Sequence, residues 1–303
     1  MDIVSIIKKD RQIKDNSLQA YITSLKKIND DKEIENVDFL KNVKKIEEKL
    51  KDLKLTTKKN RYTAILVLLR AVGGQEELLK EYRETLDKLT EEYFKEISKN
   101  QKTESQSQNW VSLKELKKVM RNYGEEVKGR GLKNKNKLSS KENTLLQNYL
   151  ITSLYLLIPP KRLDYNVKVV KKKSDIKDGD NYLVNESKSN KTFVIQDFKT
   201  SKSHGTMEFT VPKILNNVIN LSLKFNDTGF LLLNNRGGRL SANGLGKMVT
   251  RAFSPTGKKI TLNLLRKITI SELVDSDAIK KNQKLANDMG HSVNVQQTVY
   301  LKE

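Results

Sequence analysis

The stretch TLLQNYLITSLYLLIPPKRLDYNVKVV, residues 144–170, decides the fold class of this chain. Its first fifteen residues are mostly apolar and long enough for a buried helix. Pro159 and Pro160 end that helix, because proline has no amide hydrogen to continue it. A short run at 165–170 then predicts a strand, and similar runs follow at 181–184, 192–198 and 207–211. We therefore expect an α+β arrangement, mainly helical with one small antiparallel sheet.

Helical spacing of apolar residues surrounds this region on both sides. Residues 17–97 predict about four amphipathic helices in a compact bundle, which makes residues 1–97 a helical domain. Residues 98–109, SKNQKTESQSQN, contain no aliphatic side chain and have the composition of a flexible linker. Residues 110–303 form the second domain. Its helices are expected near 110–120, 144–158, 213–225, 241–253, 262–274 and 277–289.

The charge of the chain points to a polyanionic partner. Among 303 residues, 58 Lys and Arg against 37 Asp and Glu leave a formal charge of +21. Cations placed on phosphates release condensed counterions, so nucleic acid is the first expectation. An alternative remains open, because enrichment in both Lys and Asn also arises from compositional drift on solvated surfaces. The cations of residues 128–141 are open to the same two interpretations, phosphate contact or solvated loop.

Several classes of site are excluded or disfavoured by composition. The absence of cysteine excludes disulfides, thiolate metal sites and cysteine nucleophiles, and two histidines make a histidine-based metal site a poor expectation. We expect no metal and no cofactor. No stretch approaches the eighteen apolar residues of a membrane span, so we expect an intracellular protein with no membrane partner.

Two C-terminal blocks carry a recognisable pattern. They read NLLRKITISELV at 263–274 and KLANDMGHSVNVQQTVYLKE at 284–303, with a Gly-His pair nine residues before a tyrosine. This pattern resembles the tyrosine recombinase (phage integrase) family. That family's signature is a first Arg, a strand Lys, a His-x-x-Arg, and a Gly-His followed nine residues later by a nucleophilic Tyr. The chain departs from it at one position, because Asn263 stands where the family usually has His.

The resemblance implies a catalytic role for six residues. The arginines would bind the nonbridging phosphate oxygens through planar, bidentate guanidinium groups. The strand lysine would protonate the leaving 5′ oxygen. Lys199 is favoured for this role over Lys202. The tyrosine would become linked to a 3′ phosphate. An amide at 263 can donate a hydrogen bond but cannot accept the tyrosine proton, so a slower enzyme is expected unless a water or His291 acts as the base. The implied set is Arg162, Lys199, Asn263, Arg266, His291 and Tyr300.

The implied function is site-specific DNA recombination or integration for a mobile or viral element. Residues 1–97 would be the core-binding domain, and double-stranded DNA would be clamped between it and residues 110–303 in a homotetrameric synaptic complex. Energy is conserved in the covalent link, so ATP is not required. Two rivals remain open. One is a type IB DNA topoisomerase, which relaxes supercoils as a monomer, and the other is a DNA-binding protein of the same fold whose catalytic site has decayed.

Overall fold

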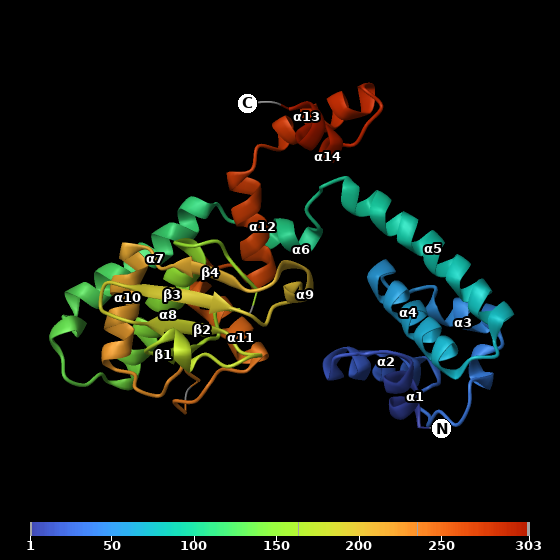
Figure 1. The fold of residues 1–303 in the computed structure, drawn as a ribbon, viewed down its shortest axis with the longest axis horizontal. Coiled ribbons are helices and arrows are strands. Elements are labelled where there is room, and N and C mark those ends of the chain that lie inside the picture. The colour runs from blue at the N-terminus through green and yellow to red at the C-terminus, as the bar shows by residue number, and fades with distance from the viewer. Residues whose placement is uncertain (1, 163, 235, 302–303) are drawn as a thin grey trace. The chain divides into compact units, whose positions relative to one another are not determined.

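The computed structural model describes residues 2–162, 164–234 and 236–301, and it divides into two compact units, residues 1–102 and 103–303 (Figure 1). Each unit has its own buried apolar core. In the part of the chain that the structure describes, no helix is both long and apolar enough to cross a membrane.

The first unit is a helical bundle around α4 (Leu55–Val72), whose residues 64–69 are all buried. Tyr82, on the last helix of this unit, donates a hydrogen bond from its hydroxyl to the carbonyl of Leu40 at 2.7 Å. Leu40 lies in the turn before the third α-helix, so this bond joins that turn to the last helix. The other elements are α1 (Ile3–Asp10), α2 (Asp15–Ile28), the 3-10 turn η1 (Asp38–Leu40), α3 (Val43–Leu50) and α5 (Glu76–Ser98).

Two features of this unit differ from the sequence prediction. It has five α-helices in its described residues instead of about four, because the eight residues of α1 form a further helix that buries two isoleucines one turn apart. Val37 and Leu40 continue the helical spacing of Val43 and Ile46 in the sequence, yet α3 begins only at Val43. There the side chain of Asn42 accepts a hydrogen bond from the amide of Lys45 and caps the new helix.

Part of the predicted linker is helical and belongs to the second unit. Residues 98–109 were predicted to be a flexible linker, yet α6 (Glu104–Asn109) lies within them. The side chains of Thr103 and Gln106 form a reciprocal capping box at its start, and the Asn109 side chain accepts a hydrogen bond from the amide of Lys259 at 2.8 Å. The composition of these residues is typical of a linker and does not reveal the helix cap formed by Thr103 and Gln106.

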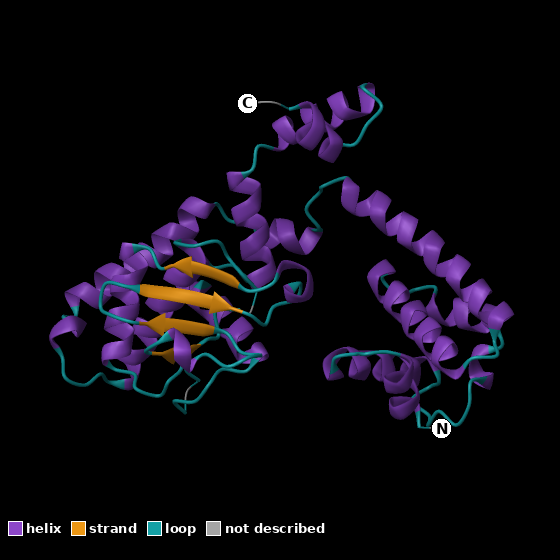
Figure 2. Cartoon of the chain, in the orientation of Figure 1, coloured by secondary structure: helices purple, strands orange, loops and turns teal. Residues whose placement is uncertain are grey.

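The second unit packs helices against a four-stranded sheet with strand order β1-β2-β3-β4 (Figure 2). Its core is centred on α8 (Ser140–Leu156), which contacts α7, α10 and α11. The strands are β1 (Lys168–Val170), β2 (Tyr182–Asn185), β3 (Lys191–Ile195) and β4 (Met207–Thr210). The remaining helices of this core are α7 (Leu113–Gly129), α10 (Lys213–Lys224), α11 (Ala242–Ala252) and α12 (Leu262–Leu273).

The sheet is mixed, whereas the sequence predicted an antiparallel one. β1 and β2 pair in parallel, with Lys168 opposite Tyr182, and the other two pairs are antiparallel. The eleven residues 171–181 include the 3-10 turn η3 (Lys173–Asp175), and they return the chain to the start of β1 before β2 begins. A pattern of apolar residues predicts a strand but does not report the direction of its neighbour.

Two buried tyrosines fix the loop between α8 and β1. Tyr155 donates a hydrogen bond to the carbonyl of Arg162 and Tyr165 donates one to the carbonyl of Pro159, each at 2.7 Å. Their rings meet edge to face at 5.4 Å. Burial raises the pKa of both phenols above the ordinary value, so both remain protonated donors. The main chain that carries Arg162 is therefore held by the core.

The β2–β3 hairpin contains a buried lysine. Lys191 is 1% exposed, and its ammonium group donates to the carbonyls of Ser187 and Lys188 and to the side-chain oxygen of Asn220 at 2.7 Å. Burial lowers its pKa below the ordinary value. The group therefore loses its proton more readily in the folded chain than in the unfolded one.

This difference predicts a pH-dependent stability. Between the lowered folded pKa and the unfolded value of about 10.4, the unfolded chain binds more protons at Lys191, so the free energy of unfolding rises with pH in that window. Urea unfolding at neutral and at mildly alkaline pH measures this rise. We expect Lys191→Met to reduce the rise and Lys188→Met, at an exposed lysine of the same hairpin, to leave it unchanged. An equal rise in all three proteins would contradict the assignment.

The chain ends in α13 (Ser276–Asp288), α14 (Val293–Val295) and the π-helix η5 (Gln296–Tyr300). α13 and α14 lie beyond the end of α12 that points away from the sheet (Figure 1). Gly290 ends α13 with a φ of 73°, a left-handed conformation that favours glycine, and the amide of His291 bonds back to the carbonyl of Ala286 at 3.0 Å. The Gly-His pair is thus a helix stop that sets where the histidine lies.

Candidate active site

Arg162 and Arg266 both act on the carboxyl group of Asp164. Burial raises the pKa of this half-buried carboxyl, while Lys161, a main-chain hydrogen bond from Arg162 and the charges of Arg266 and Arg162 lower it. A charge lowers a neighbour's pKa in this way only at short range. Arg162 and Arg266, 104 positions apart in the sequence, therefore both lie near enough to Asp164 for their charges to act on its carboxyl group. Asp164 was not among the predicted site residues.

The position of Arg266 is set by the loop after α8. Arg266 lies half-buried on α12, and its Nε donates a hydrogen bond to the carbonyl of Pro160 at 3.1 Å. Among the hydrogen bonds of the described residues, its two terminal nitrogens have no protein acceptor. Asn263 is exposed one turn earlier on the same helix, at the spacing that puts two side chains on one face.

Lys199 lies in the turn between β3 and α9 (Ser201–His204), and its side chain is exposed. Beside this turn is a cavity of about 480 Å³, lined by Lys202 together with Gly179, Gln196, Asp197, Ser201, Gly205 and Thr206. The sequence analysis favours Lys199 over Lys202 as the lysine that protonates the leaving 5′ oxygen. Both side chains are exposed on this connection, so the choice between them stays a prediction.

His291 and Tyr300, nine residues apart in the sequence, are in contact. Their rings stack with centroids 5.0 Å apart and an interplanar angle of 22°. The Nδ1 of His291 is 3.2 Å from the carbonyl of Ser292, which can only accept, so in the neutral ring the hydrogen is on Nδ1. Nε2 is then an acceptor, and it is buried without a hydrogen-bond partner among the described residues. Tyr300 itself is 58% exposed.

The six predicted residues form separate groups. Arg162 and Arg266 both lie near Asp164, and His291 stacks on Tyr300, but among the described residues no hydrogen bond, ion pair or ring contact joins the arginines to His291 or Tyr300. Lys199 and Asn263 are exposed and have no side-chain hydrogen bond within the described part of the chain. Within residues 2–162, 164–234 and 236–301, no three His, Asp or Glu side chains gather as a metal site would require.

The basic segment 128–141 is more ordered than the predicted loop. It contains the end of α7 and the 3-10 turn η2 (Leu132–Asn134). The ammonium group of Lys224 donates to the carbonyls of Lys133 and Lys135 at 2.8 and 2.7 Å, which fixes the main chain. Five of its six cations are exposed, namely Lys128, Arg130, Lys133, Lys137 and Lys141.

No family model matches this sequence, and no curated protein matches it. Among solved structures, the chain is similar to XerA recombinase at 14% identity and a TM-score of 0.34, covering 99% of this chain and 92% of that one. It is also similar to a lambda integrase(75-356) dimer bound to a COC′ core site, at 13% identity and a TM-score of 0.35, covering 94% of this chain and 95% of that one.

Proposed function

We propose that this chain cleaves and rejoins DNA strands as a site-specific recombinase, with Tyr300 as its nucleophile. The observation that carries the proposal is that the charges of Arg162 and Arg266 both act on Asp164, while Arg266 also binds the carbonyl of Pro160 in the same loop. Each guanidinium group presents a planar pair of donors that can bind two anionic oxygens. Two such groups near one carboxyl group supply more donors than that group needs, and they can bind the nonbridging oxygens of a phosphate.

The proposed reaction needs four roles. The hydroxyl oxygen of Tyr300 forms a bond to phosphorus, and the bond from phosphorus to the 5′ oxygen breaks. Arg162 and Arg266 stabilise the charge on the nonbridging oxygens, and Lys199 gives a proton to the departing 5′ oxygen. The strand is then held as a 3′ phosphotyrosine until a 5′ hydroxyl attacks and reverses the steps.

His291 is the best candidate to accept the proton of Tyr300. Its ring stacks on the tyrosine, and its Nε2 has a lone pair with no partner among the described residues. Asn263 cannot take this role, because an amide nitrogen does not accept a proton at neutral pH. We assign Asn263 a hydrogen bond to the phosphate instead, on the same face of α12 as Arg266.

The proposal requires Tyr300 to reach a phosphate held between Arg162 and Arg266. The segment that carries Tyr300 joins α12 through residues 274 and 275, which are extended and outside both helices. A change in backbone torsion there would carry α13, α14 and η5 as a body. We propose that double-stranded DNA induces this movement, in a homotetramer acting on two sites of a mobile or viral element inside the cell.

Covalent trapping on nicked DNA tests the function. The full chain is incubated with a library of nicked duplexes of random sequence, in which the fragment beyond the cleaved bond diffuses away and religation fails. We expect a protein–DNA adduct that survives denaturant and enriches one sequence. Relaxation of supercoiled DNA with no preferred sequence would favour the topoisomerase instead. DNA binding with no adduct on any duplex would favour a decayed enzyme.

Salt dependence tests the DNA-binding part separately. With a net charge of +21, we expect each phosphate contact to release counterions, so the logarithm of the binding constant falls linearly with the logarithm of salt concentration. The expected slope is about −6 to −10, from roughly −0.9 per phosphate contacted. Fluorescence anisotropy with a labelled duplex at several salt concentrations measures it. A flat profile would mean that the excess charge does not contact DNA.

A further inference from the structure

Asn181 is a buried side chain whose hydrogen-bonding capacity is fully used. It lies immediately before β2 and is 7% exposed. Its Nδ2 donates to the carbonyls of Asp164 at 3.3 Å and Asp197 at 2.9 Å. Its Oδ1 accepts from the amides of Gln196 and Asp197, both at 2.8 Å. An amide side chain has two donor hydrogens and two acceptor lone pairs, and all four are satisfied here.

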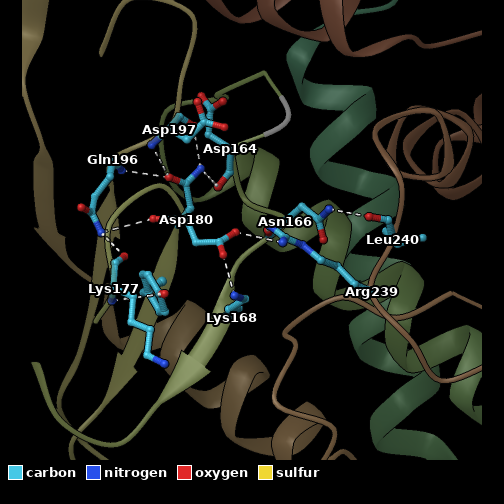
Figure 3. A network of polar contacts seen from close by, with 11 residues as sticks. Asp164, Asn166, Lys168, Lys177, Asp180, Gln196, Asp197, Arg239 and Leu240 are labelled. Atoms are coloured by element: carbon cyan, nitrogen blue, oxygen red, sulfur yellow. Dashed lines mark hydrogen bonds and ion pairs between the residues drawn. The ribbon is translucent and has the colours of Figure 1, made fainter. Parts of the chain in front are cut away.

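These bonds join the two segments that carry Arg162 and Lys199. Asp164 comes two residues after Arg162, and Asp197 comes two residues before Lys199. Figure 3 shows Asp164 and Asp197 next to each other, above Asp180. One side chain therefore sets the spacing between a loop that follows α8 and a turn that follows β3, although neither segment is adjacent to the other in sequence.

The main chain around Asn181 is itself held firmly. The carboxylate of Asp180 pairs with Lys168 at 2.5 Å and with Arg239 at 2.9 Å (Figure 3). The carbonyl of Asn181 accepts from the amide of Lys168 at 2.9 Å. The Gln196 side chain adds hydrogen bonds at 3.3 Å to two carbonyls before Asn181. These contacts hold the main chain at Asn181, so its side chain positions both segments from a fixed attachment.

We propose that Asn181 is a positioning residue that fixes the turn of Lys199 against the loop of Arg162. This inference rests on the proposed function, in which Lys199 protonates the oxygen that leaves the phosphate bound by Arg162. A displacement of about 1 Å between a proton donor and its target costs roughly 10²-fold in rate. Loss of the Asn181 side chain frees the turn on the side where three hydrogen bonds now hold it.

Asn216 provides a matched control. It is also buried, at 6% exposed, and its side chain also donates to a main-chain carbonyl, that of Lys188 at 2.8 Å. That carbonyl is at the tip of the β2–β3 hairpin, outside the segments of Arg162 and Lys199. If buried asparagines mattered only for folding, substitutions at the two positions would have the same kind of effect.

The test compares two leaving groups with Asn181→Ser and Asn216→Ser in the full chain. The duplex selected by covalent trapping is made once with the ordinary 5′ oxygen at the cleaved bond and once with sulfur in its place. Sulfur leaves as a thiolate that needs no proton, so it removes the need for Lys199 while the phosphorus–tyrosine bond still forms. We expect Asn181→Ser to cleave the oxygen substrate about 10²-fold more slowly than wild type and the sulfur substrate within about tenfold of wild type. Asn216→Ser should be near wild type on both.

A second variant keeps the proposal testable if Asn181→Ser does not fold. Gln196→Ala removes a half-buried side chain that holds the same turn. We expect this variant to cleave the oxygen substrate less slowly than Asn181→Ser does, and to cleave the sulfur substrate at close to the wild-type rate. Equal slowing of both substrates, or an unchanged rate on oxygen, would overturn the positioning role. Failure of the wild-type chain to form any adduct would instead overturn the proposed function.

Discussion

Replacing Tyr300 with phenylalanine is expected to abolish covalent capture of DNA completely. The substitution removes the hydroxyl oxygen that the proposed reaction joins to phosphorus, and no other change in the side chain accompanies it. The ring can still stack on His291, and the residue is 58% exposed, so folding should be unaffected. DNA affinity should also be retained, because the phosphate contacts are assigned to cations. The measurement is the denaturant-resistant adduct on the selected nicked duplex.

Tyr93→Phe is the matched control for this variant. Tyr93 is a half-buried tyrosine of α5 whose ring lies 4.2 Å from the ammonium group of Lys59, a contact that phenylalanine preserves. We expect full adduct formation in this protein. Adduct formation by Tyr300→Phe at the wild-type rate would remove Tyr300 as the nucleophile.

Replacing Arg266 with alanine is expected to slow adduct formation by about 10³-fold, the upper part of the range found when one preorganised donor to a developing anion is removed. The Nε bond to the Pro160 carbonyl holds the guanidinium group in place before DNA binds. A group oriented in advance stabilises the transition state without further ordering. Single-turnover cleavage of the nicked duplex measures the effect.

Two further variants separate geometry from charge. Arg266→Lys keeps the positive charge but not the planar pair of donors, and we expect it to recover only part of the lost rate. Lys267→Ala removes a charge from an exposed neighbour on the same helix and should leave the rate of cleavage close to wild type. If Arg266→Ala and Lys267→Ala slowed cleavage equally, the effect would come from the loss of one positive charge and not from a specific phosphate contact at Arg266.

Much of the secondary structure follows from local patterns. Four strands and the helices around α8 were predicted, because apolar periodicity and Pro159-Pro160 report burial and chain breaks directly. The sequence does not predict α6, because serine and glutamine are typical of linkers, although the side chains of Thr103 and Gln106 cap this helix. The parallel pairing of β1 with β2 depends on the path of residues 171–181 in space, which no local pattern reports.

The candidate site was predictable to a different extent. The order and spacing of six residues suggest a shared phosphate. In the structure His291 stacks on Tyr300, and Arg162 and Arg266 both lie near Asp164, while Lys199 and Asn263 belong to neither pair, so the shared site stays a prediction. Asp164 and Asn181 had no sequence signal. Their importance comes from tertiary partners, since an isolated asparagine before a strand predicts nothing until the carbonyls that it binds are known.

The central claim is that the phenol of Tyr300 attacks a phosphorus atom bound by the two arginines. The most direct measurement is to digest the trapped adduct with protease and nuclease and to identify the modified peptide by mass spectrometry. We expect a nucleotide attached through its 3′ phosphate to the tyrosine of the peptide that contains residue 300. A nucleotide on any other residue, or one attached through a 5′ phosphate, would contradict the account.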